Sequence, residues 1–133
     1  PTLSRTYVGR IVYMGFCDKL FDINERLEPI PQLATAHRWD DPQTLTITLR
    51  QGVRFHDGEM MDAEAVRYSL NRHLTMQGSF RRSEMGGVTA IEVVDPQTVR
   101  IRLAQPNAAF LATLTDRAGM ILSPKAAEAA GRN

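Results

Sequence analysis

The chain has 133 residues, of which 43% are hydrophobic and 23% charged, a composition typical of one folded soluble domain spanning residues 1–133. Sixteen Lys and Arg against fifteen Asp and Glu leave a net charge of +1, too small for the phosphate neutralisation on which nucleic-acid binding depends. No apolar run approaches the roughly 20 residues that span a bilayer, and residues 1–10 lack the apolar core of a signal peptide.

The N-terminal region is predicted to be helical and then extended. Apolar or small residues recur at helical spacing at Val8, Ile11, Val12 and Gly15. This spacing predicts an amphipathic helix from Ser4 to about Lys19, with the Ser4 side chain as its N-cap. Leu20–Ile23 is predicted to be a short extended segment. Pro29 and Pro31 then favour an extended path, because proline fixes its own φ and restricts the residue before it.

One segment occurs twice in similar form. Asp41–Leu49 reads DPQTLTITL, and Asp95–Leu103 reads DPQTVRIRL. In each copy Asp-Pro favours a turn, and the alternation after it predicts a strand with one apolar face buried and Thr or Arg toward water. The predicted buried positions are Leu45, Ile47, Leu49, Val99, Ile101 and Leu103. We expect Ala36–Trp39 and Val88–Val94 to be the hairpin partners, which gives an antiparallel sheet.

Helices are predicted to cover this sheet. Asp62 is suited to cap a helix that runs to Leu74 and docks an apolar stripe on the inner face. That stripe is Ala63, Val66, Leu70 and His73. Further on, the pattern predicts a helix at Asn107–Leu114 capped by Asn107, a strand at Met120–Leu122, and a helix at Lys125–Ala130 with Pro124 before it and Gly131 after it. The predicted class is α+β, a small mainly antiparallel sheet with helices packed on one face.

The chain carries no recognisable motif for catalysis or for a bound metal. Cys17, the single cysteine, cannot form an internal disulfide and is interpreted as a small buried residue. His37, His56 and His73 are too widely spaced for a dedicated metal site. Adjacent His56 and Asp57 lack a nucleophile at any known spacing, so we assign this pair a structural role. We therefore predict no cofactor, no metal and no enzyme activity.

Three arginines lie between predicted elements. Arg81 and Arg82 follow the central helix, and Arg117 precedes the predicted strand at Met120–Leu122. Their ordinary interpretation is a solvated surface position. The alternative is a ligand-binding role, because a guanidinium group can hold a carboxylate with two parallel hydrogen bonds.

Leu49–Gly58, followed by Asp62–Val66, closely resembles the signature stretch of the family 5 extracellular solute-binding proteins. These proteins serve ABC importers of dipeptides, oligopeptides, glutathione and nickel complexes. Further segments resemble the family in order and spacing: Cys17–Leu20, Pro31–Ala34, Trp39, Ser69–Arg72, Asp95–Leu103, Pro106, Phe110–Leu111 and Leu122–Ala126. The resemblance covers essentially the whole chain.

The resemblance implies that the chain is a fragment, because family members are several times longer. It corresponds to the small inserted domain II of a periplasmic binding protein type 2-like fold, with flanking pieces of lobe one. Such proteins close two lobes around a ligand, and the second lobe lies outside this sequence. By the same resemblance, Arg117 matches an arginine that faces a ligand carboxylate in nickel-binding relatives. Arg81 or Arg82 falls near a second such arginine, and Arg10 belongs to a helix near the cleft.

The function implied is capture of a dipeptide, oligopeptide or glutathione in the periplasm and its delivery to an ABC permease, without membrane insertion of this segment. Three alternatives stay open. The ligand could be a nickel chelate or an oligosaccharide. The same scaffold could serve as a ligand sensor. An enzyme would need a convergent set of titratable groups, which the sequence does not display.

Overall fold

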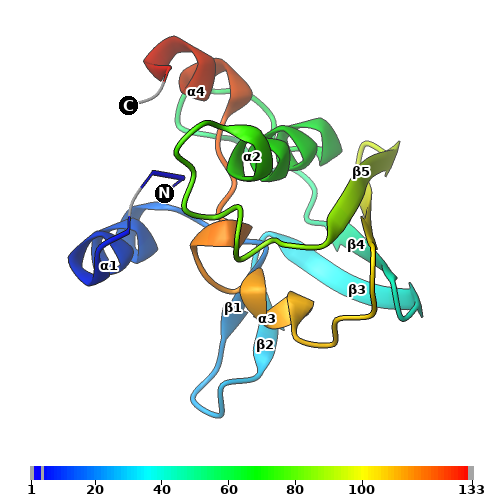
Figure 1. The fold of residues 1–133 in the computed structure, drawn as a ribbon. Helices are drawn as coiled ribbons and strands as arrows, with labels where there is room; N and C mark the ends of the chain where they lie inside the picture. The colour runs from blue at the N-terminus through cyan, green and yellow to red at the C-terminus, as the bar shows by residue number, and fades with distance from the viewer. Residues whose placement is uncertain (1, 4, 132–133) are drawn as a thin grey trace.

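The computed structural model describes residues 2–3 and 5–131, which form helices around two small antiparallel sheets (Figure 1). The elements in chain order are α1 (Tyr7–Phe16), β1 (Phe21–Ile23), β2 (Pro29–Pro31), β3 (Ala34–Asp41), β4 (Thr44–Leu49), α2 (Ala63–Thr75), β5 (Val88–Asp95), β6 (Thr98–Leu103), α3 (Phe110–Thr113), the 3-10 helix η1 (Arg117–Gly119) and α4 (Pro124–Ala130). None of the helices in these residues is long and apolar enough to cross a membrane.

The two repeated segments form the centre of a four-stranded sheet. Its strand order is β3-β4-β6-β5, so β4 and β6 pair with each other as well as with their own hairpin partners. Leu45 lies opposite Ile101, and Ile47 lies opposite Val99. Both predicted hairpins are confirmed, and the predicted α+β class with them.

The two Asp-Pro turns that precede β4 and β6 are built alike. The Asp41 carboxylate accepts a hydrogen bond from the Gln43 N–H, and the Asp95 carboxylate accepts one from the Gln97 N–H, both at 2.8 Å. An aspartate that bonds the backbone two residues on closes a turn by itself. The same short sequence therefore starts both central strands.

The main core lies between the inner face of this sheet and α2, which packs against β5 and β6. The predicted buried positions on β4 and β6 are buried: Leu45, Ile47, Leu49, Val99, Ile101 and Leu103. The Asp62 carboxylate caps α2 by accepting a hydrogen bond from the Ala65 N–H at 2.9 Å. The predicted stripe of α2 is buried as well: Ala63, Val66, Leu70 and His73.

The outer face of the sheet is less exposed to water than the alternating sequence pattern predicts. Thr44 and Thr46 are buried, although we expected Thr side chains to face water. The Thr46 hydroxyl donates a hydrogen bond to Asp40 on β3, and Asp40 also forms an ion pair with Arg38 at 2.6 Å. The hydrogen bond from Thr46, followed by that from Arg38, lowers the pKa of Asp40. Charged side chains of a neighbouring strand thus cover Thr46.

The first helix is shorter than predicted. The Thr6 hydroxyl accepts a hydrogen bond from the Gly9 N–H at 3.0 Å, so Thr6 is the N-cap and α1 begins at Tyr7. The predicted cap, Ser4, lies outside the described residues. The helix ends at Phe16, and Cys17 is already extended.

Two predictions for the C-terminal part were wrong. The Asn107 side chain accepts from the Ala109 N–H in a turn, and α3 begins only at Phe110. Met120–Leu122 is not a strand, since Met120 makes only an isolated bridge with Lys19. The Leu122 N–H instead donates to the Ser69 hydroxyl at 2.9 Å, so the backbone of this segment bonds to a side chain of α2. The last helix is confirmed, with Pro124 as its first residue and Gly131 at its end.

Gly119 allows η1 to turn back tightly against the end of α3. A Cβ atom at this position would lie 1.9 Å from the Leu114 carbonyl oxygen, closer than real Cβ contacts. The Gly119 carbonyl oxygen accepts a hydrogen bond from the Leu20 N–H at 2.9 Å, which joins η1 to the segment before β1. Only glycine fits this crossing.

His73 connects α2 to two distant parts of the chain. Its Nε2 lies 3.1 Å from the Met120 carbonyl oxygen, and its Nδ1 lies 2.9 Å from the Thr2 hydroxyl oxygen. A carbonyl oxygen only accepts, so Nε2 carries the proton and Nδ1 accepts from Thr2. Arg72 donates to the same hydroxyl oxygen at 3.0 Å. Burial lowers the pKa of His73 to about 4, so the ring is neutral at pH 7.

The neutral His73 makes stability depend on pH. Between pH 6.5 and 4 the unfolded chain binds a proton at His73 and the folded chain does not, so the free energy of unfolding falls as pH falls through this window. We expect a loss of about 3 kcal/mol by pH 4 relative to pH 7 from this group. Urea unfolding of His73→Gln should show a shallower pH dependence. The matched variant His56→Gln, at an exposed position, should keep the original slope; equal slopes in all three proteins would contradict the prediction.

Gly119→Ala should destabilise the fold, because its Cβ has no space beside the Leu114 carbonyl. We expect a loss of about 1–3 kcal/mol in urea unfolding, the usual range for overpacking. Gly15→Ala is the control, since a Cβ at Gly15 meets nothing within 4 Å in α1 and helical alanine is favoured over glycine. A Gly119→Ala protein as stable as the parent would refute this account of the crossing.

Candidate functional site

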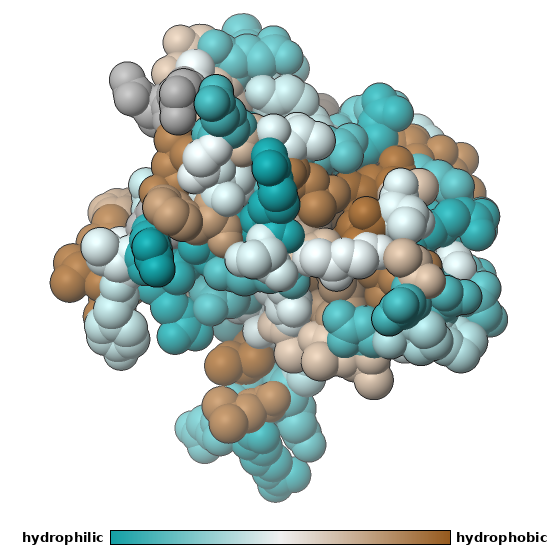
Figure 2. Space-filling model, in the orientation of Figure 1, coloured by the Kyte–Doolittle hydropathy of each residue, from teal (hydrophilic) through white to brown (hydrophobic). Residues whose placement is uncertain are grey.

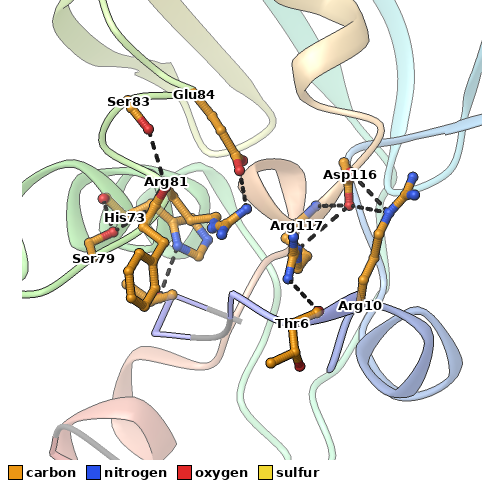
Figure 3. Close-up of polar contacts among 11 residues, drawn as sticks. Thr6, Arg10, His73, Ser79, Arg81, Ser83, Glu84, Asp116 and Arg117 are labelled. Carbon is orange, nitrogen blue, oxygen red and sulfur yellow. Dashed lines mark hydrogen bonds and ion pairs between the residues drawn. The ribbon is translucent and has the colours of Figure 1, made fainter. Parts of the chain in front are cut away.

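Two of the predicted ligand-binding arginines meet around a carboxylate. Arg10 on α1 places its Nε 3.2 Å and 3.1 Å from the two carboxylate oxygens of Asp116. Asp116 is the N-cap of η1 and also accepts a hydrogen bond from the Arg117 N–H at 2.7 Å. Figure 3 shows Asp116 between Arg10 and Arg117. α1 and η1 thus approach each other through this cluster.

Arg117 points back to the start of α1. Its Nη1 donates to the Thr6 carbonyl oxygen at 3.2 Å, and its Nε lies 4.0 Å from Asp116 Oδ1 (Figure 3). The side chain is only 11% exposed. Arg10, Asp116 and Arg117 together carry two positive charges and one negative charge. Two guanidinium groups beside one carboxylate at a partly shielded position suit an anionic group.

The other two predicted arginines have different surroundings. The Arg81 side chain is buried and forms an ion pair with Glu84 near His73 (Figure 3). Arg82 is exposed, and its Nε and Nη2 donate to the carbonyl oxygens of Leu74 and Thr75 at 2.8 Å and 3.1 Å. These carbonyls belong to the last turn of α2, where carbonyl groups lack helical partners. Arg82 therefore caps α2. Of the four predicted arginines, Arg10 and Arg117 are the two that share a carboxylate.

No local sequence pattern singles out Asp116 as a site residue. Its signal is weak, because an aspartate before a three-residue helix looks like any loop residue. The usable sequence signal was the preference of aspartate for the N-cap position of a helix. What makes Asp116 a functional candidate is the approach of Arg10, which lies 106 positions away in the chain.

A separate groove of about 460 Å³ lies beside the signature stretch. It is lined mainly by apolar side chains, including Phe16, Leu33 and Val53, and none of the candidate arginines reaches it. At its edge the Ser123 hydroxyl donates to Asp57, and this hydrogen bond, followed by that of the Glu59 N–H, lowers the pKa of Asp57. Asp57 thus joins its turn to the N-cap of α4, the structural role that we predicted.

Neither the Cys17 thiol nor the possible metal-binding side chains of the described residues show a reactive or metal-binding arrangement. Cys17 is half-buried, and desolvation raises the pKa of its thiol, which disfavours the reactive thiolate. Within residues 2–3 and 5–131, no group of three or more His, Cys, Asp or Glu side chains is placed to hold a metal ion.

Comparison with known proteins identifies the family of this chain. Residues 28–133 match the model for bacterial extracellular solute-binding proteins, family 5 middle. The chain is 37% identical over 135 aligned residues to the glutathione-binding protein GsiB of Salmonella paratyphi A, a match that covers 100% of this chain and 26% of GsiB. It is 32% identical to GsiB of Escherichia coli K12, with 99% and 26% covered. The chain thus spans about a quarter of the length of these relatives.

Solved structures agree with the sequence match. The PBP AgaA from A. tumefaciens R10, in complex with agropinic acid, has a TM-score of 0.85 at 28% identity, with 94% of this chain and 26% of AgaA covered. The Escherichia coli murein tripeptide binding protein MppA has a TM-score of 0.88 at 22% identity, with 99% and 29% covered, and shows the shared fold. This chain therefore belongs to family 5 of the bacterial extracellular solute-binding proteins.

Proposed function

We propose that the full-length protein is the substrate-binding component of an ABC importer. It captures glutathione, a dipeptide or an oligopeptide in the periplasm and delivers it to a permease, without chemical turnover. The observation that carries this proposal is the identity of 37% with a glutathione-binding protein over the whole chain. The chain itself is a single domain that supplies part of one lobe, and the rest of the polypeptide supplies the opposing wall of the cleft.

The arginine cluster supports an anionic ligand. Peptides and glutathione carry free carboxylates, and a guanidinium group holds a carboxylate with two parallel hydrogen bonds. Arg10 is about one-third exposed and can turn from Asp116 toward a ligand, whereas Arg117 is fixed by Thr6. We assign Arg117 and Arg10 to ligand binding. Arg81 and Arg82 are secondary candidates, because both already hold structural partners.

A second candidate ligand is a small chelate or another organic acid. NikZ from Campylobacter jejuni, solved with Ni(L-His), has a TM-score of 0.71 at 27% identity, and AgaA was solved with agropinic acid. Such ligands also carry carboxylates, so the same positive cluster suits them. Competition between glutathione and Ni(L-His) for the full-length protein separates the two candidates.

Titration calorimetry of the full-length protein with glutathione and short peptides tests the proposal. We expect one ligand to bind with a Kd of about 1 µM or tighter, and the 133-residue chain alone to bind it far more weakly because half of the cleft is missing. Micromolar binding by the isolated chain would contradict the proposal that the rest of the polypeptide supplies the opposing wall of the cleft. Failure of every peptide and of glutathione would favour the chelate or another solute.

Arg117→Ala should weaken binding of that ligand by about tenfold or more, with partial retention in Arg117→Lys, since lysine cannot bind a carboxylate through two parallel hydrogen bonds. Arg38→Ala is the control, because Arg38 is 73% exposed on β3, outside the arginine cluster. Melting temperatures of the variants separate loss of binding from loss of fold. An unchanged Kd in a folded Arg117→Ala protein would remove Arg117 from the site.

A further inference from the structure

Asp116 is the fixed partner in its ion pair with Arg10. Its carboxylate caps η1 by accepting a hydrogen bond from the Arg117 N–H at 2.7 Å. Its carbonyl oxygen accepts another from the Gly119 N–H at 2.9 Å. Both bonds lie within η1 and do not involve Arg10. They hold the Asp116 carboxylate in place while 34% of its side chain stays exposed.

Arg10 is the movable partner of this pair. It lies on α1, where none of the ten residues is buried, and its own side chain is 36% exposed. Figure 2 shows hydrophobic side chains of α1 at the surface, at the left edge of the molecule. The helix is therefore held by few packing contacts. A partly exposed arginine on such a helix can change rotamer without disturbing a core.

The contact between Arg10 and Asp116 is not the strongest that the two groups can make. Nε of Arg10 lies 3.2 Å from one carboxylate oxygen and 3.1 Å from the other, so a single N–H is shared between both oxygens (Figure 3). A carboxylate that can move freely takes two nitrogens of a guanidinium group, with one parallel hydrogen bond to each oxygen. A ligand carboxylate at Arg10 can therefore form a better bond than Asp116 does.

We propose that Asp116 is an internal competitor of the ligand carboxylate. The Asp116 carboxylate occupies Arg10 before the ligand binds, and the ligand carboxylate takes its place. Asp116 then keeps its hydrogen bond from the Arg117 N–H and its position 4.0 Å from Arg117 Nε. This inference rests on the proposed function, because it concerns the same arginines. It adds that a residue of the site lowers the affinity for the ligand.

Such a competitor would discriminate against small anions. An acetate ion offers Arg10 one carboxylate, which Asp116 already supplies, and it gains nothing from the rest of the cleft. Glutathione or a peptide makes further contacts, which compensate for displacing Asp116. Selectivity is a difference between affinities, and an element that opposes the wrong ligands increases it. Asp116 is thus assigned as a specificity-determining residue.

Titration calorimetry of the full-length Asp116→Asn protein with glutathione tests the exchange. Asparagine caps a helix as well as aspartate does but carries no charge, so η1 should keep its start. We expect glutathione to bind about fivefold tighter than to the parent, because no carboxylate competes for Arg10. Asp62→Asn, the same substitution at the N-cap of α2, should leave the Kd unchanged. An equal or weaker affinity of the Asp116→Asn protein would overturn the proposal.

A double variant separates competition from a structural role of Asp116. In an Arg10→Gln background we expect Asp116→Asn to change the Kd for glutathione by less than about twofold, because the two charges no longer interact. A structural role would instead lower the melting temperature and weaken binding in both backgrounds. The same gain in affinity with and without Arg10 would contradict competition for that arginine.

Acetate provides a test that does not depend on the biological ligand. It should raise the melting temperature of the full-length Asp116→Asn protein at concentrations about fivefold lower than those needed for the parent, compared with sodium chloride at equal ionic strength. The same acetate dependence in both proteins would refute the competitor role. This difference together with no binding of glutathione or peptides would support the competitor role and reject only the proposed function.

Discussion

The pairing of β4 with β6 is the interaction on which the rest of the structure depends. It places Leu45 opposite Ile101 and Ile47 opposite Val99, although these strands lie some fifty positions apart in the chain. Each strand alone has one apolar face, and side by side they make a surface wide enough to bury the stripe of α2. Without this surface α2 would have no reason to pack, and the segments that bond to α2 would lose their anchor.

α2 connects the sheet to the candidate site through buried polar contacts. Ser69 accepts from the Leu122 N–H, and His73 donates to the Met120 carbonyl, so two side chains of α2 hold residues 120–122 in addition to the isolated bridge with Lys19. Met120 directly follows η1, and η1 carries Arg117. The position of a ligand-binding candidate therefore depends on hydrogen bonds made by a core helix. Because buried polar groups are costly when unpaired, these contacts also favour a single arrangement of the segment.

α1 stands apart from this core and depends on charge for its attachment. The bonds from Arg10 to Asp116 and from Arg117 to Thr6 hold it against η1, while its apolar residues face solvent. Partly exposed ion pairs contribute little stability each. The proposed binding of a carboxylate at Arg10 would therefore act directly on the contact that holds α1.

The sequence by itself determined the central sheet, α2 and the family, because these depend on local rules. Asp-Pro turns, strict alternation after them and Asp62 before an apolar stripe act within a few residues, and the matching stretch at Leu49–Gly58 is contiguous. The tertiary structure decided the rest. Thr46 is buried because charges from β3 and β6 cover it, and residues 120–122 form only an isolated bridge, with further hydrogen bonds to side chains of α2. Asp116 became part of the candidate site only when the fold brought Arg10 to it, a contact between residues too distant in the chain for any local pattern to encode.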